Sequence, residues 1–442
     1  MLRFNRKKRR KEPRKEPENF YFQQKNLTLV EVTFYVLSMK PIQYRVLFVN
    51  FLIAALLGLL LRGAFVFPIE GMTFLYVLHG HSHVALLGWL YLLVYVLLVD
   101  QFGLQNPREE RFYRRLFWVT QVAVLGMAVT FPFQGYAAPS IFFSTLHIIC
   151  SYCFVYRLWR YHRITNIQQV LWVKTALFFM VFSTLGVWFL GPAIGMMGKA
   201  SAFFQLCIQF FLHFQFDGWF FTAFIALLLP QFFSKGMEKK PFQRFYTLWI
   251  TSVVLTYALP ASWYIAVPSL YYINGVGVLL QTLAFGYGIK PLYQHLKREK
   301  RKQIKANQVN YNLALAVFVG ICLVLRLLTQ FAVLNEAFAG ELKGIRSWIV
   351  SFIHLNMLGL FTALGLLLLI QKRKLALTTW TKVGICCLLL GFISTEGILA
   401  IQGAQQFFRL TWIDTATIFT LLFGFSILLP VSVVCFLVHR SK

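Results

Sequence analysis

The sequence predicts an all-α polytopic membrane protein with about twelve transmembrane helices, arranged as three quasi-equivalent four-helix units. Three observations support this fold class: an apolar composition, evenly spaced apolar runs and a histidine motif that recurs every four runs. Of the 442 residues, 58% are hydrophobic and 13% charged, and the mean hydropathy is +0.64, whereas about a quarter of the residues in soluble domains are charged. This composition excludes a soluble globular protein.

Apolar runs long enough to cross a hydrocarbon core of about 30 Å recur along most of the chain. Charged or turn-rich breaks separate them. The predicted spans are 46–66, 76–98, 116–133, 140–159, 171–190, 201–229, 245–265, 268–289, 311–333, 347–370, 381–401 and 413–437.

The net charge of +28 would suggest a nucleic-acid partner in a soluble protein. Here the basic residues gather in alternate connections, which indicates the positive-inside rule instead. These connections, predicted as loops, are 107–115, 157–163, 234–244, 295–305, 371–374 and 439–442. We therefore expect no nucleic acid, membrane lipid as the main partner, and a cytoplasmic (inner) membrane location with both termini cytoplasmic.

The chain divides into three parts by composition. Residues 1–44 are rich in Lys and Arg and predict a disordered cytoplasmic arm. Residues 45–438 predict one membrane domain, and 439–442 a short cytoplasmic tail. The seven cysteines all fall within apolar spans, where they can act as small hydrophobic residues.

A repeated motif marks the second, sixth and tenth spans, and in each a histidine is followed by a glycine five residues later. The motif residues are His83, Gly88 and Trp89; His213, Gly218 and Trp219; and His354, Gly359 and Leu360. In the predicted topology all three spans run inward, so their histidines lie at a similar depth, roughly 10–18 Å below the outer boundary. The four-span interval predicts three four-helix units.

Ionisable groups are costly in the hydrocarbon, so they usually face the bundle interior and carry function. Imidazole is a common metal ligand and an axial ligand of haem iron. In the second span, His79 and His83 share one helical face, and His81 points nearly opposite. One face could meet a cofactor and the other a neighbouring helix or a second site. His147 shares the depth without the motif, which favours a structural role.

Further polar residues lie at membrane depth. Gln205, Gln209, His213 and Asp217 recur every four residues, so Asp217 could orient His213 at a metal. Arg62 could pair with a haem propionate or extend to the interface. Glu396 could relay protons or pair with another helix. Asn356 follows His354 on the other side of its helix.

Twelve spans with histidines on the second, sixth and tenth resemble haem-copper oxidase subunit I and its nitric oxide reductase relatives. The segment from His81 to Trp89 also resembles the H-x-H-x-x-L-x-G element of the NnrS family, membrane proteins associated with haem, copper and nitric oxide stress. The resemblance implies that His354 and a histidine of the second span (His83, or His79 or His81) hold a low-spin haem. It places His213 where the oxidases have a copper ligand.

The chain departs from the oxidase pattern at the copper site. The seventh span has no histidine where the oxidases need two, and Phe352 stands at the position of a second histidine in the tenth span. Asp217 stands where a tyrosine follows the sixth-span histidine. The expectation is a haem-binding, redox or nitric-oxide-related membrane protein without the three-histidine copper site. Copper near His213, oxidoreductase activity, and a cytochrome or other respiratory subunits as partners stay open.

Two other functions remain as alternatives. A secondary transporter could use the histidines and Glu396 for proton coupling, although transporters of two six-span halves would repeat every six spans. A non-catalytic subunit of a respiratory complex could retain the histidines for packing.

Overall fold

The structure is a computed structural model that describes residues 38–233, 236–306 and 310–438. In those ranges every regular element is a helix, which confirms the predicted fold class. Most of the predicted arm (1–44) and all of the tail (439–442) lie outside the described residues. The first helix of the described residues begins at Pro41, so the last four residues of the predicted arm are helical.

The helices follow the predicted order of spans. The first unit contains α2 (Pro41–Gly63), α3 (Phe74–His83) continued by η1 (Val84–Leu90), α4 (Tyr91–Leu98) and η2 (Val99–Gly103), then α5 (Pro107–Gln134) and α6 (Ala138–Arg160). The second contains α7 (Ile167–Met197), α8 (Ala202–His213) continued by η3 (Phe214–Phe221) and α9 (Thr222–Phe232), then α10 (Lys239–Leu255), α11 (Ala258–Ser262) and α12 (Ser269–Ala306). The third contains α13 (Tyr311–Ala332), α14 (Glu336–Leu342), α15 (Arg346–His354) continued by η4 (Leu355–Phe361) and α16 (Thr362–Gln371), then α17 (Thr379–Phe408), α18 (Thr415–Ser426) and α19 (Leu428–Val438).

Eleven helical segments in the described part of the chain are long and apolar enough to cross a membrane. The predicted eighth span, 268–289, corresponds to the first half of α12, which is not among the eleven. Its 38 residues are sufficient in length, but the buried amides of Asn274 and Gln281 make it less apolar. It packs beside α10 and α13, in the place expected for the eighth span.

Two of the basic connections predicted as loops are helical instead. The segment 107–115 forms the first turns of α5, because Asn106 caps the helix by accepting hydrogen bonds from the backbone N–H groups of Arg108 and Glu109. Pro107 then occupies the first helical position, where its missing N–H costs nothing. The segment 295–305 continues α12. Charged residues marked the membrane boundary in both places and did not mark the end of the helix.

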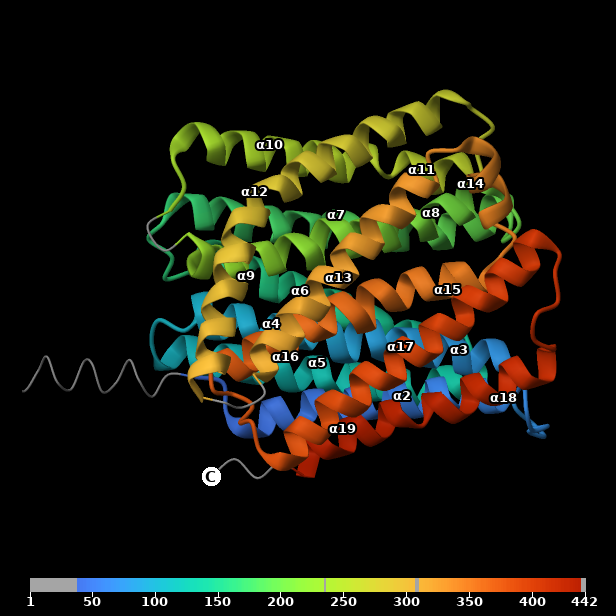
Figure 1. The fold of residues 1–442 in the computed structure, drawn as a ribbon, viewed down its shortest axis with the longest axis horizontal. Helices are drawn as coiled ribbons and strands as arrows, with labels where there is room; N and C mark the ends of the chain where they lie inside the picture. Colours follow the sequence, from blue (N-terminus) through green and yellow to red (C-terminus); the bar gives the residue numbers. More distant parts are fainter. Residues whose placement is uncertain (1–37, 234–235, 307–309, 439–442) are drawn as a thin grey trace, which may run out of the picture. The chain divides into compact units, whose positions relative to one another are not determined.

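The three units repeat the same packing order. In each, the first span packs on the second, the second on the third, and the third on the fourth. The last span returns to the first, because α18 and α19 pack along α2 (Figure 1). The three units therefore close into a ring.

The second, sixth and tenth spans form the inside of that ring. Within their most apolar 18 residues, 78%, 72% and 78% of positions are buried, against 33–39% in the other eight spans. Their middle turns meet in pairs. Between the second and tenth spans, Trp89 donates its indole N–H to the hydroxyl of Thr362 at 2.9 Å. Between the sixth and tenth, Phe224 stacks on Phe361 with ring centroids 5.6 Å apart. Between the second and sixth, the ring centroids of Tyr91 and Trp219 lie 6.4 Å apart.

The glycines of the repeated motif allow other helices to approach closely. A Cβ at Gly88, Gly218 or Gly359 would lie 2.7–2.8 Å from Val124, Phe179 or Phe392 respectively. The motif therefore has a steric role, in which each inner span is pressed against an outer span at the glycine.

Gly218→Ala should lower the thermal stability of the purified protein by about 1–3 kcal/mol, because Phe179 and the backbone must move to admit the methyl group. Gly320→Ala is the matched control, since a Cβ there meets no atom within 4 Å. Thermal unfolding in detergent measures both. Equal stability of the two variants would contradict the proposed close contact.

Candidate functional site

Each repeated histidine precedes a widened, π-helical turn. His83 leads into η1, His213 into η3 and His354 into η4. In such turns the backbone hydrogen bonds join residues five positions apart instead of four, and the turns are frequent at functional sites. Hydroxyls stabilise two of them: Thr222 donates to the carbonyl of Asp217 at 3.3 Å and Thr362 to that of Met357 at 2.8 Å. The three histidines thus have the same structural register, as the sequence repeat predicted.

Equal register also explains why these three histidines do not face one another. Residues related by a threefold repeat occupy equivalent places in separate units, unless they lie on the central axis. His83 faces the third and fourth spans of its own unit, where its ring stacks on Phe131 at 4.2 Å and interacts electrostatically with His147. The second-span histidine that interacts electrostatically with His354 is His81, on the opposite side of the same helix.

His81 and His354 belong to one polar cluster between the first and third units. His81 Nδ1 lies 2.9 Å from the carbonyl oxygen of Ala54, and His354 Nδ1 lies 2.9 Å from a carboxylate oxygen of Glu396. Arg62 interacts electrostatically with both His81 and Glu396. The structure therefore brings together Arg62 and Glu396, which the sequence offered as separate candidates.

The acceptors determine which ring nitrogen remains free. A carbonyl oxygen only accepts hydrogen bonds, so Nδ1 of His81 carries the hydrogen and Nε2 keeps its lone pair. The Glu396 carboxylate fixes the same arrangement in His354. Histidine ligands usually donate one ring N–H to a carbonyl or carboxylate in this way and bind the metal through the other nitrogen. The His354 side chain is also 28% exposed although its span is mostly buried.

Two further details describe this cluster. The second carboxylate oxygen of Glu396 is buried without a hydrogen-bond partner, so it could still accept a hydrogen bond. The His81 ring packs closely on α2 at Gly58, because a Cβ there would lie 2.9 Å from His81 Cε1. The cluster offers two imidazole Nε2 atoms, a carboxylate and a guanidinium, which is a donor set that fits a haem with its propionates.

His79 and His83 share a face, as predicted, and form a second cluster with Tyr136. His83 Nδ1 lies 2.8 Å from the carbonyl of His79, four residues earlier. The Tyr136 hydroxyl is 3.5 Å from His83 Nε2, at the limit of a hydrogen bond. His147 is buried and packs edge-on against Tyr91 at 4.7 Å. These contacts explain both faces of the second span: one faces this cluster and the other faces His354.

His213 differs from His81 and His354 in the ring nitrogen that is hydrogen-bonded. Its Nε2 donates to the carbonyl of Val253 at 2.7 Å, so the free nitrogen is Nδ1, which lies 3.9 Å from an Asp217 carboxylate oxygen. The other Asp217 oxygen is 2.5 Å from Arg326. Asp217 is thus held by a guanidinium.

Arg326 is the functional candidate that sequence reasoning did not single out. It is the one charged residue of the apolar helix α13, its side chain is 2% exposed, and it donates hydrogen bonds to Asp217 and to the side-chain oxygen of Asn356. An ionisable residue at membrane depth was the available signal. Its position opposite Asp217 needed the packing of the sixth, ninth and tenth spans.

The surroundings of His213 do not fit a copper ion. Val253 occupies Nε2, and Arg326 already neutralises Asp217. Over the described ranges, no group of three or more His, Cys, Asp or Glu side chains is placed to hold a metal ion. Copper near His213 therefore stays a prediction.

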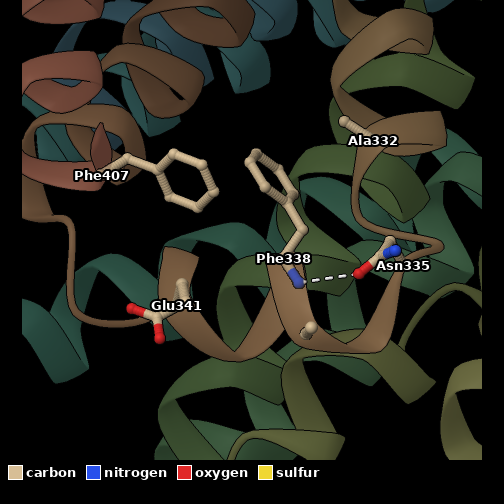
Figure 2. Close-up of a pocket in the computed structure, with 6 residues that line it drawn as sticks. Ala332, Asn335, Phe338, Glu341 and Phe407 are labelled. Carbon is tan, nitrogen blue, oxygen red and sulfur yellow. Dashed lines mark hydrogen bonds between the residues drawn. The ribbon is translucent and has the colours of Figure 1, made fainter.

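A separate pocket of about 450 Å³ lies beside α14, where the rings of Phe338 and Phe407 face each other above Glu341 (Figure 2). Ala332, Asn335 and Ala337 complete its lining. None of the candidate histidines lines it, so the polar clusters described above remain the candidate site.

Comparison with known proteins adds no identification: no family model matches the chain, and no curated protein matches it significantly.

Arg326→Met should destabilise the protein by about 3–5 kcal/mol, because it leaves the Asp217 carboxylate buried without its partner. Adding Asp217→Leu should recover much of that loss, since the double variant buries no unpaired charge. Thermal unfolding in detergent measures the changes, and Arg346→Met, an exposed arginine of the next span, is the control. A double variant less stable than Arg326→Met would contradict the pairing.

Proposed function

We propose that the chain is a haem-binding integral membrane protein in which His81 of the second span and His354 of the tenth hold the iron. The observation that carries this proposal is the matched hydrogen bonding of the two rings. Each has Nδ1 fixed by an oxygen acceptor and Nε2 free, and the two interact across the boundary between the first and third units.

The remaining groups of the cluster have roles that follow from their charge. Arg62 would pair with a propionate carboxylate, and Glu396 would hold His354 in the tautomer and orientation that an axial ligand needs. Gly58 keeps α2 close enough for the Ala54 carbonyl to orient His81. When bound, a haem with two imidazole ligands supplies one-electron transfer. These residues would hold and orient the group.

The resemblance to haem-copper oxidase subunit I, nitric oxide reductases and NnrS proteins favours a redox or nitric-oxide-related role. It rests on the repeated histidine motif and on the threefold packing of four-helix units. Under this proposal the termini are cytoplasmic, the site lies towards the outer face of the inner membrane, and electrons are exchanged with a cytochrome or another respiratory subunit. Oxygen reduction at a three-histidine copper site is not part of the proposal.

The wild type, purified from cells supplied with haem, should show a Soret band and about one haem per chain by the pyridine haemochrome assay. His81→Ala and His354→Ala should each lose the band or shift it strongly, because each removes an axial ligand. Added imidazole should restore it in His354→Gly, where the deleted side chain leaves space for the free ligand.

His83→Ala and His213→Ala are the matched controls, since each removes the motif histidine that is equivalent to His354 in another unit. They should keep the haem. A colourless wild type would contradict the proposal. Loss of haem in His83→Ala, with retention in His81→Ala, would assign the iron ligand to the other face of the second span.

The two alternative functions predict other results. Substrate-dependent proton flux without haem would favour the transporter. Wild-type activity of a larger complex after histidine replacement would favour the non-catalytic subunit.

A further inference from the structure

Arg326 contacts the helical turn that carries His354, on the face opposite to the His354 side chain. Its guanidinium donates to the side-chain oxygen of Asn356 and lies 5.7 Å from the ring of Phe352. Phe352 and Asn356 are four residues apart and share a face, whereas His354 lies midway and points to the opposite side. The guanidinium and the imidazole are therefore separated by about one helix diameter, roughly 10 Å.

The amide of Asn356 is held in a fixed orientation for this contact. Its NH₂ group donates to the carbonyl of Phe352 at 2.7 Å, which directs its oxygen towards Arg326. Asp217, from the sixth span, holds the guanidinium on its other side, and the ring of Phe221 lies 5.4 Å from it. Arg326 thus joins η3 and η4, the turns that follow two of the three repeated histidines.

The two charges of the Arg326–Asp217 ion pair lie on different spans. The positive guanidinium contacts the tenth span, and the negative carboxylate belongs to the sixth. Both side chains are buried, with 2% and 8% exposure, so water screens them little. Reduction of a haem iron adds one negative charge to its site, so a nearby buried cation favours the reduced state and a buried anion opposes it.

We propose that Arg326 is a positioning residue that fixes the turn carrying His354 and raises, by its buried charge, the reduction potential of the haem that His354 holds. This inference rests on the proposed function. It assigns Arg326 and Asp217 opposite electrostatic effects on the same iron, although they form one ion pair.

Potentiometric titration of the purified haem protein tests the inference. Arg326→Gln leaves the Asp217 charge and should lower the ratio of reduced to oxidised haem at a fixed potential by about tenfold. Asp217→Asn leaves the Arg326 charge and should raise the ratio by a similar factor. Tenfold is the order expected for a unit charge roughly 12 Å from an iron that would lie just beyond the imidazole, at an effective dielectric constant of about 20.

The double variant Asp217→Asn with Arg326→Gln buries no unpaired charge, so it should fold and should return towards the wild-type ratio. Arg326→Lys keeps the charge and should stay closer to the wild type than Arg326→Gln. Arg346→Gln makes the same charge change at the exposed start of the tenth span, which carries His354, and should leave the ratio unchanged. If Arg326→Gln cannot be recovered, Asp217→Asn alone still tests the direction.

A shift of both single variants in the same direction would indicate loosened packing or water entry and would overturn the inference. Unchanged potentials in a haem-bearing protein would also overturn it while leaving the proposed function intact. A wild type without haem would overturn both, so the two failures are distinguishable by the absorption spectrum before titration.

Discussion

In the hydrocarbon core a polar side chain must find its partner within the protein, and this constraint organises the whole bundle. The second, sixth and tenth spans carry most of the chain's histidines at membrane depth and are the most buried spans of the described structure. Their glycines press them against outer spans, and their widened turns meet in the centre. The outer spans expose apolar side chains on the outside of the bundle. They also supply the acceptors and charges that the inner spans need, such as Ala54, Glu396 and Arg326.

The histidines lie in three different environments within the bundle, and the groups around them determine whether a ring nitrogen is free to bind a ligand. Between the first and third units, His81 and His354 keep Nε2 free. Within the first unit, His83 packs on Phe131 and is closest in character to a buried structural histidine. Within the second, His213 is bonded to Val253 and lies beside a neutralised carboxylate. One repeated motif therefore provides three sites of different chemistry, because each is completed by other spans.

The fold was predictable because its signals are local. Apolar runs placed the spans, and the interval between His83, His213 and His354 placed the units. The continuation of α5 and α12 beyond the apolar runs was missed, since charge marks the end of the hydrocarbon and not the end of a helix. The site was only partly predictable. Helical periodicity separated His81 from His83, but the choice between them depends on which unit each face meets. Arg326 gained its meaning only from Asp217 and Asn356, which are 109 and 30 residues away.

The central claim is that two imidazoles from different units hold one haem, and the electron paramagnetic resonance spectrum of the oxidised wild type tests it most directly. The account predicts a low-spin ferric signal typical of two nitrogenous axial ligands, from about one haem per chain. A purely high-spin ferric spectrum, or a protein that takes up no haem when haem is supplied, would contradict it.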